Sequence, residues 1–330
     1  MKKFVNNTEN IISDSLRGFQ AVHRNLITVH ESPLYICRAQ SPKQKKLVLI
    51  SGGGSGHEPL HIGMVGAGML DAACPGQIFT SPTPQQIVAA SKAVHQGKGI
   101  LFLVKNYSGD RMNFEMAIEE LDIENTTVDI CDEVVFGSLP TSEDRRGIAG
   151  TVIYEKMLGA LAESGADLST CLQLSRELHS AVRSMGVALT NCTPPITAEG
   201  ANSIAVNEME IGIGIHGEPG RICMEISSAD AIAEMLVNAI SDDLGLSKSD
   251  EILLYVNGMG GTPLMELYLM YDSAAKFCQQ KGFTITRSLV GNYTTAIDMA
   301  GCSITLCRMN PQLTRLWDYP VTTPAFCWGK

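Results

Sequence analysis

Two histidines lie in glycine-rich turns that follow predicted β-strands. His57 belongs to Ser51–Pro59, which reads Ser-Gly-Gly-Gly-Ser-Gly-His-Glu-Pro, and His216 belongs to Ile213–Gly220, which reads Ile-Gly-Ile-His-Gly-Glu-Pro-Gly. A neutral imidazole nitrogen can add to a reactive carbonyl, and a carboxylate or a second histidine can take a proton from a neighbouring hydroxyl. These residue types predict an enzyme that acts on a small molecule, and their chemistry would suit a hydroxy-ketone.

The glycines of the first turn allow a ligand to approach the backbone closely. Gly52, Gly53, Gly54 and Gly56 have no Cβ, so their amides can lie against a small molecule, and His57 is expected at the rim of the loop. The segment lacks the last glycine of a Rossmann motif and the lysine of a Walker A motif. We therefore expect no nucleotide cradle in this chain.

A zinc site is an alternative interpretation, because His57-Glu58-Pro59-Leu60-His61 fits the H-E-x-x-H pattern of zinc proteases. That chemistry needs both histidines on one face of a helix. Pro59 disfavours helix at Glu58, so His57 is expected to precede any helix that carries His61. We expect no metal site, and a zinc hydrolase would be recognised by bound metal.

The composition is that of an ordinary globular protein of the cytoplasm. The 330 residues are 45% hydrophobic and 18% charged, enough for two domains with sizeable cores. The net charge of -10 disfavours nucleic acid and anionic membranes as partners, and no apolar run reaches the length of a bilayer span. Ten scattered cysteines without C-x-x-C, and no secretory leader, are typical of reduced core cysteines. The one basic cluster, Lys43, Lys45 and Lys46, is expected in a solvated loop.

The first half of the chain repeats a unit in which a short apolar strand ends in polar residues. Such strands are predicted at 47–50, around 76–80 and at 99–104, with helices after the second and third. This alternation is typical of a largely parallel, doubly wound sheet, in which ligands bind beyond the carboxyl ends of the strands. The side chains expected to converge there are those of His57, Ser81, Lys105 and Asp110.

We expect a boundary between two domains near Gly186, which gives a first domain of residues 1–185 and a second of residues 186–330. Helical patterns over Arg146–Ser164 and Ser169–Ser184 would close the first domain. The predicted fold class is α/β, with two α/β domains that each have a largely parallel or mixed sheet flanked by helices.

In the second domain, His216 is expected at the end of a strand. Ile211, Ile213 and Ile215 alternate with glycines, which is typical of a strand that another backbone approaches closely. A helix over Ala229–Ser241 is expected to follow.

Simpler structural roles compete with these functional ones. Asp110 precedes a predicted helix and could be its N-cap, Lys105 could be solvated at its strand end, and Ser81 could form a turn before Pro82. His61 is expected to be an ordinary core histidine.

With these motifs in order, the chain resembles the dihydroxyacetone-binding K subunit of dihydroxyacetone kinases of the phosphotransferase-dependent type. The resemblance runs nearly end to end. It rests on the motifs Ser51–Pro59, Gly68–Gly76, Phe79–Pro84, Lys105–Asp110, Ile213–Gly220 and Leu316–Asp318.

The resemblance implies a homodimeric subunit of two α/β domains that binds dihydroxyacetone. It implies that His216 forms a covalent hemiaminal with the substrate carbonyl, which selects short ketones and aldehydes over glycerol. It also implies that Asp110 takes the proton of the attacking terminal hydroxyl, helped by His57. The residues implied to hold the oxygens of the substrate are Gly53, Gly54, Ser81 and Lys105.

The resemblance further implies that this chain binds no cofactor and does not phosphorylate alone. In the family, a separate L subunit holds ADP and magnesium, and a phosphohistidine subunit, M, recharges it. The alternative is a dihydroxyacetone-sensing paralogue that co-activates transcription through a DNA-binding partner. The retained Asp110 and His57 favour the kinase, because a sensor has less need of a base.

One segment departs from the family pattern. Many relatives have Asp-Ser-x-Tyr-Thr-x-Gly-Arg-Arg-Gly where this chain reads Gly137–Gly147, and only Arg145-Arg146-Gly147 is kept. We expect this segment to shape the face that docks a partner subunit and to leave the substrate site untouched.

Overall fold

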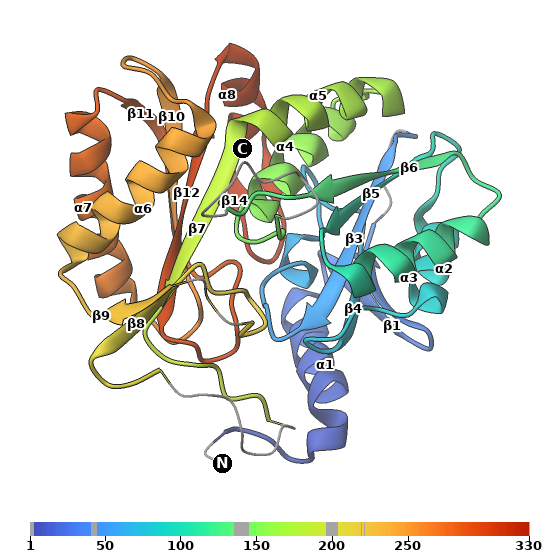
Figure 1. The fold of residues 1–330 in the computed structure, drawn as a ribbon. Helices are drawn as coiled ribbons and strands as arrows, with labels where there is room; N and C mark the ends of the chain where they lie inside the picture. Colours follow the sequence, from blue (N-terminus) through green and yellow to red (C-terminus); the bar gives the residue numbers. More distant parts are fainter. Residues whose placement is uncertain are drawn as a thin grey trace.

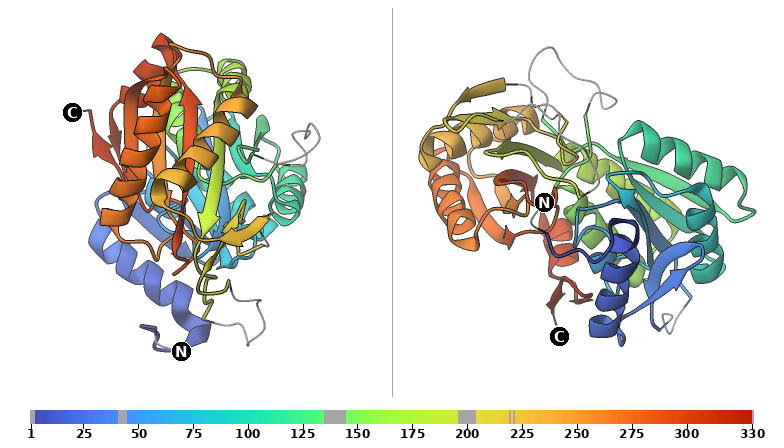
Figure 2. Two further views of the ribbon diagram at one scale, coloured as in Figure 1. Left: turned by 60° about the vertical axis from the view of Figure 1, so that its left-hand side comes forward. Right: turned by 90° about the horizontal axis from the view of Figure 1, so that it is seen from below.

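The computed structural model describes residues 3–40, 45–134, 145–195, 204–218, 220 and 222–329. These residues form two α/β units that lie side by side, each built on a six-stranded sheet (Figure 1). The view from below in Figure 2 separates the first unit from the second, which carries the later part of the chain. The predicted fold class, two sheets flanked by helices, is confirmed.

The first sheet has the strand order β1-β2-β4-β3-β5-β6. Strands β4, β3, β5 and β6 are parallel, whereas β1 and β2 form an antiparallel hairpin that pairs antiparallel with β4. The parallel part carries the strand ends at which the sequence predicts the site. The strands are β1 (Ile27–Glu31), β2 (Leu34–Arg38), β3 (Val48–Ser55), β4 (Ala72–Ile78), β5 (Ile100–Lys105) and β6 (Asn125–Ile130).

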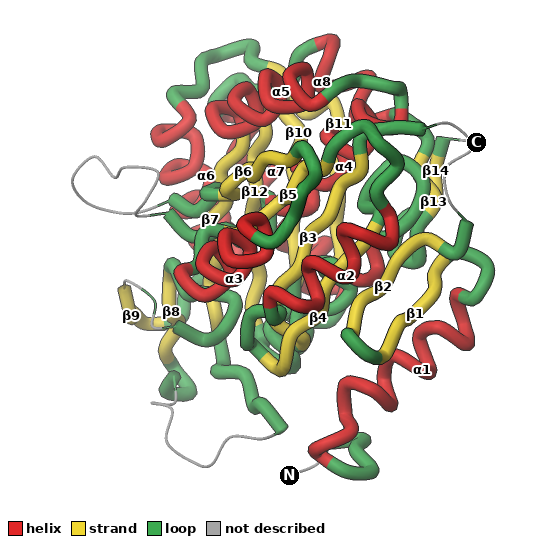
Figure 3. The backbone as a smooth tube through the Cα atoms, turned by 90° about the vertical axis from the view of Figure 1, so that its right-hand side faces the viewer, coloured by secondary structure: helices red, strands yellow, loops and turns green. Residues whose placement is uncertain are grey.

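Helices cover both faces of the first sheet, which explains why β3 and β5 are buried along their whole length. Val48 and Phe102 belong to the core cluster with α2 and α3, and Leu49 and Leu101 belong to the cluster with α4 and α5. Successive residues of a strand point to opposite faces, so this division is the expected one. Figure 3 shows α2 and α3 in front of the first sheet. These helices are α2 (Pro84–Val94), α3 (Ser108–Glu119), α4 (Thr151–Glu163) and α5 (Leu168–Ala181).

The second sheet has the order β11-β10-β12-β7-β8-β9, and only its β10–β11 pair is parallel. Helices α6 and α7 cover one face through residues such as Leu236 and Leu267. The strands are β7 (Val182–Ala188), β8 (Glu208–Ile211), β9 (Ile222–Glu225), β10 (Glu251–Gly258), β11 (Thr284–Gly291) and β12 (Gly301–Arg308), and the helices are α6 (Ala229–Leu244) and α7 (Leu264–Gln280).

One core cluster joins the two units. Leu49 and Leu101 of the first sheet share it with Val152 of α4 and with Leu253 and Tyr255 of the second sheet. Helix α4 therefore packs between the sheets. The remaining elements are α1 (Ile11–His23), α8 (Pro311–Asp318), the strands β13 (Val321–Thr322) and β14 (Cys327–Trp328), and the short 3₁₀ helices at Thr8–Asn10 and Ile62–Met64.

The boundary expected after residue 185 falls inside β7, whose residues 182–188 all pair with β12 of the second sheet. The predicted division into domains 1–185 and 186–330 thus cuts a strand of the second sheet, and the division itself stays a prediction. The helix expected to end at Ser184 ends at Ala181, because β7 begins at Val182.

Two further local expectations were wrong. The strand expected to reach Ile215 ends at Ile211, because Gly212 has a φ of 72° and turns the chain out of the extended conformation. The strand expected at 47–50 continues to Ser55, so Gly52, Gly53 and Gly54 belong to β3 rather than to a loop. In the described part of the chain, no helix is long and apolar enough to cross a membrane.

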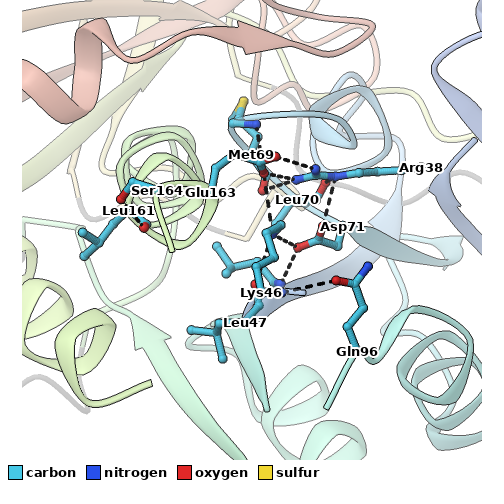
Figure 4. Close-up of polar contacts among 12 residues, drawn as sticks. Arg38, Lys46, Leu47, Met69, Leu70, Asp71, Gln96, Leu161, Glu163 and Ser164 are labelled. Atoms are coloured by element: carbon cyan, nitrogen blue, oxygen red, sulfur yellow. Dashed lines mark hydrogen bonds and ion pairs between the residues drawn. The ribbon is translucent and has the colours of Figure 1, made fainter. Parts of the chain in front are cut away.

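A buried ion network holds the amino-terminal ends of β3 and β4 (Figure 4). Asp71 lies 2.6 Å from Lys46 Nζ and 3.0 Å from Arg38 Nε, and Arg38 also contacts Glu163 of α4 at 2.9 Å. Lys46 is therefore buried, not solvated as predicted, because Asp71 supplies a partner for its charge. The network ties the first sheet to α4.

Asp71→Asn should lower the free energy of unfolding by about 3–5 kcal/mol, because Lys46 loses its nearest carboxylate and the two buried cations keep only Glu163. Urea unfolding of the variant and the wild type measures the difference. Asp14→Asn is the matched control, because Asp14 pairs with the exposed Arg17 and is itself more exposed than Asp71. This variant should change stability by less than about 1 kcal/mol. Equal losses in the two variants would contradict a special role for Asp71.

Candidate active site

The residues predicted to form a site lie around the carboxyl ends of β3, β4 and β5. His57 follows β3, Ser81 follows β4, and Lys105 is the last residue of β5. Asp110 lies in the first turn of α3, which follows β5. Parallel strands end at the same edge of a sheet, which explains why residues far apart in sequence meet here. The second unit adds His216, from the turn that follows β8.

The rings of His57 and His216 are in contact, with their centroids 4.7 Å apart and their planes at 66°. Phe79 lies 5.1 Å from the ring of His57 and 5.6 Å from that of His216, and Tyr107 lies 4.6 Å from His216. Phe79 and Tyr107 lie inside motifs of the sequence, but the motifs alone predicted no role for either. Together the four rings form a cluster at the junction of the two units, in which His57 is buried and the other three are partly exposed.

His57 is fully buried. The prediction from its glycine neighbours, that it lies at the rim of a loop, was therefore wrong. Its Nδ1 lies 2.7 Å from the carbonyl oxygen of Thr295, which can only accept, so Nδ1 carries the hydrogen. Nε2 keeps its lone pair and has no hydrogen-bond partner in the described part of the chain. Burial, with the nearby His216 and Lys105, lowers the pKa of His57 well below its usual value. His57 is thus a neutral imidazole with a free acceptor.

Glu218, for which the sequence predicted no role, orients His216. Nδ1 of His216 lies 2.8 Å from Oε1 of Glu218, and the backbone N–H of His216 donates to Oε2 at 3.1 Å. Burial raises the pKa of Glu218, but the hydrogen bond and charge of His216, with a smaller contribution from Arg146, lower it overall. In the neutral ring, Nδ1–H therefore points to a carboxylate, and Nε2 carries the nucleophilic lone pair. The signal available in the sequence was a carboxylate two residues after the histidine.

Lys105 and Asp110 are both buried and form an ion pair, with Nζ and Oδ2 3.6 Å apart. The alternative of a solvated Lys105 is thereby wrong. Asp110 is the third residue of α3 and not its N-cap, a position that Tyr107 occupies without a side-chain cap. The N-terminus of a helix favours a carboxylate, so α3 stabilises the charge of Asp110.

Close packing of neighbouring backbone and side-chain atoms explains the glycines of β3. A Cβ on Gly53 would lie 2.3 Å from Nζ of Lys105, and a Cβ on Gly54 would lie 2.6 Å from the backbone of Phe79. A Cβ on Gly109 would meet the hydroxyl oxygen of Ser81 at 2.8 Å, which places Ser81 against the start of α3. The structure therefore brings Ser81, Lys105 and Asp110 together at this edge, as predicted, with Gly53 and Gly54 beside them, and their roles in binding stay a prediction.

The helix that a zinc site of the H-E-x-x-H type needs is not formed. Residues 57–61 form turns and not a helix, and Nε2 of His61 lies 2.8 Å from the ammonium group of Lys105. Among the described residues, no group of three His, Cys, Asp or Glu side chains could hold a metal ion.

Of the segment that departs from the family pattern, the structure describes only the retained end, Arg145-Arg146-Gly147, so the expectation for the divergent residues stays a prediction. Residues 137–144 lie outside the described residues, but Arg146 pairs with Glu133 and lies 3.9 Å from Glu218. A Cβ on Gly147 would lie 3.0 Å from Cα of Lys105. The end of the segment therefore packs against site residues.

The chain matches the family described as Dak1 domain over residues 17–325. It is 42% identical to the "PEP-dependent dihydroxyacetone kinase, dihydroxyacetone-binding subunit DhaK" of Escherichia coli, with all of both chains covered. It is 39% identical to a PTS-dependent dihydroxyacetone-binding subunit of Listeria innocua, over 94% of this chain and 95% of that one.

Solved structures with the same fold include a kinase and a regulator. The "dihydroxyacetone kinase operon co-activator" DhaQ is 32% identical, with a TM-score of 0.90 and 96% of this chain and 98% of that chain covered. The dihydroxyacetone kinase of C. freundii is 30% identical, with a TM-score of 0.87 and 99% of this chain and 60% of that chain covered. By its match over residues 17–325 and its full-length identity to kinase subunits, the chain belongs to the Dak1 domain family.

Proposed function

We propose that this chain is the dihydroxyacetone-binding subunit of a phosphoenolpyruvate-dependent dihydroxyacetone kinase. The observation that carries the proposal is the contact between His57 and His216 beside the Lys105–Asp110 pair. It combines a nucleophilic nitrogen, a free acceptor, a cation and a carboxylate at one strand edge. Identity to subunits named for dihydroxyacetone binding supports the substrate.

In the proposed binding step, Nε2 of His216 attacks the carbonyl carbon of dihydroxyacetone. A C–N bond forms as the C=O π bond opens, the carbonyl oxygen gains a proton, and the ring gives up its Nδ1 proton through Glu218. The product is a neutral hemiaminal. Glu218 assists because its carboxylate stabilises the positive charge that develops on the ring during attack. Glycerol has no carbonyl and cannot form this bond.

In the proposed transfer step, Asp110 takes the proton of the terminal hydroxyl as its oxygen attacks the phosphoryl group. Nε2 of His57 accepts a hydrogen bond from the substrate, and the Lys105 ammonium group donates one. Gly53, Gly54 and Ser81 lie along the same edge and are proposed to contact the oxygens of the substrate. The product is dihydroxyacetone phosphate.

The phosphoryl donor is proposed to reside on a partner L subunit that holds ADP and magnesium, recharged by a phosphohistidine M subunit. The resemblance to phosphotransferase-dependent kinases supports these partners, and the names of the relatives support the dependence on phosphoenolpyruvate and a phosphotransferase system. A homodimer in the cytoplasm is part of the same proposal.

A second candidate is a dihydroxyacetone sensor, which the similarity to the DhaQ co-activator favours. Such a sensor needs His216 for capture but does not need a base. The buried Asp110 beside Lys105 favours the kinase. Phosphorylated product from this chain with L and M subunits and phosphoenolpyruvate-driven phosphotransfer proteins would support the kinase, whereas an adduct without product would support the sensor.

His216→Ala should abolish the mass increase that dihydroxyacetone causes in intact-protein mass spectrometry, because the nucleophile is lost. His95→Ala, which alters a histidine outside the site, is the control and should form the adduct fully. An unchanged adduct in His216→Ala would refute the covalent role.

Glu218→Gln should slow adduct formation by about 10-fold to 10²-fold, because the amide still accepts from Nδ1 but carries no charge to stabilise the ring during attack. Time-resolved mass spectrometry measures the rate. Glu234→Gln, on the exposed side of α6, should leave the rate unchanged. A wild-type rate in Glu218→Gln would show that the carboxylate plays no part in capture.

Asp110→Asn should keep the adduct while phosphoryl transfer falls by about 10²-fold or more, because the proton acceptor is lost. The coupled assay with the partner subunits measures the transfer, and Asp122→Asn, just beyond α3, serves as control. Full activity would remove Asp110 from the role of base.

A further inference from the structure

The ammonium group of Lys105 contacts two groups that the proposed mechanism does not use, the ring of His61 and the backbone of Gly52. An ammonium group has three N–H donors. One can bond to Nε2 of His61, 2.8 Å away, and another to the carbonyl oxygen of Gly52, 3.3 Å away. The carboxylate of Asp110 lies on the remaining side at 3.6 Å, beyond ordinary hydrogen-bond distance. One N–H therefore remains for an oxygen of a ligand beside Asp110.

The contacts of His61 determine which of its ring nitrogens carries the hydrogen. Nδ1 lies 2.5 Å from Oε1 of Glu155 and 3.0 Å from the hydroxyl oxygen of Ser51. The Ser51 hydroxyl donates its only hydrogen to the carbonyl oxygen of Leu103 at 2.6 Å, so it can only accept from His61. Nδ1 is thus the protonated nitrogen. Nε2 is left with its lone pair facing Lys105, as an ammonium neighbour requires.

Glu155 is a fully buried carboxyl group on α4, whose neighbours in sequence pack in the core that joins the two sheets. Its Oε2 has no hydrogen-bond partner among the described residues. Burial raises the pKa of Glu155, against the effect of the Lys105 charge, and burial and Lys105 lower the pKa of His61. A buried ionisable pair is weak evidence for stability, so a role in orientation accounts better for this one.

We propose that His61, held by Glu155, is a positioning residue that aims one N–H of Lys105 at the bound substrate. This inference rests on the proposed function and extends it to a histidine that does not touch the substrate. The absence of a Cβ at Gly53 lets the ammonium group lie directly on the strand. If Nε2 of His61 were lost, Lys105 would turn toward other acceptors, and a small displacement of a positioning group costs about 10²-fold in rate.

A matched pair of substitutions separates positioning from packing. In His61→Gln the amide oxygen can take the place of Nε2 and still accept from Lys105. In His61→Asn the shorter amide can take the place of Nδ1, which keeps the contact with Glu155 but leaves Lys105 without its acceptor. Both variants are polar, uncharged and smaller than histidine, so a role in packing alone predicts similar losses.

We expect kcat for phosphoryl transfer to dihydroxyacetone to fall by less than about 5-fold in His61→Gln and by about 10²-fold in His61→Asn. The thermal unfolding midpoints of the two variants should agree. Glu155→Gln keeps an acceptor for Nδ1 and should resemble His61→Gln, whereas Glu155→Leu should resemble His61→Asn. Equal kcat values in the two His61 variants, or losses that follow the midpoints, would overturn the proposal.

A measurement without substrate or partner tests the geometry itself. In protein with ¹⁵N-labelled histidines, the ring resonances of His61, assigned by their loss in His61→Gln, should show the neutral tautomer with hydrogen on Nδ1. An imidazolium ring or hydrogen on Nε2 would overturn the proposal whatever the chain does catalytically. If the wild type yields no phosphorylated dihydroxyacetone but His61 shows the expected tautomer, the proposed function fails and the orientation of Lys105 stands.

Discussion

The close approach of other backbone and side-chain atoms to β3 is the constraint on which the rest of the site depends. A Cβ at Gly52 would lie 2.6 Å from the carbonyl oxygen of Cys74, whereas the contacts at Gly53 and Gly54 go to Lys105 and Phe79. Each glycine therefore sets the distance to a different element. A side chain at Gly52 or Gly54 would clash with the backbone of β4 or of the loop after it, and one at Gly53 would displace the ammonium group of Lys105, so the polar groups would no longer meet.

Buried charges occur at both ends of the first sheet, but they are satisfied differently. At the amino-terminal ends of β3 and β4, Asp71 contacts two cations at 2.6 and 3.0 Å. At the carboxyl ends, Lys105 and Asp110 are 3.6 Å apart. A carboxylate in close contact with two cations holds elements together, whereas a more widely spaced pair leaves room for a ligand. The same kind of buried ion pair thus supports the fold at one end of the sheet and belongs to the candidate site at the other.

Neither unit forms the site without the other. His216 comes from the second unit, and the second unit also fixes the ring of His57 through the carbonyl oxygen of Thr295. The shared core around α4 holds the two sheets in place, and α4 also carries Glu155. The orientation of both imidazoles therefore depends on how the two units pack.

The sequence alone determined the α/β class and the convergence of His57, Ser81, Lys105 and Asp110, because strand ends marked by glycine and polar residues are local features. Resemblance to a family supplied the roles but no distances. Only the tertiary structure decided that His57 is buried and bonded to Thr295, which lies 238 residues away in the sequence. It likewise decided that His61 contacts Glu155, 94 residues away. It also decided that the second sheet is mainly antiparallel. Periodicity and propensity describe neighbours along the chain, whereas the protonated nitrogen of a ring is set by whichever distant groups the packing brings to it.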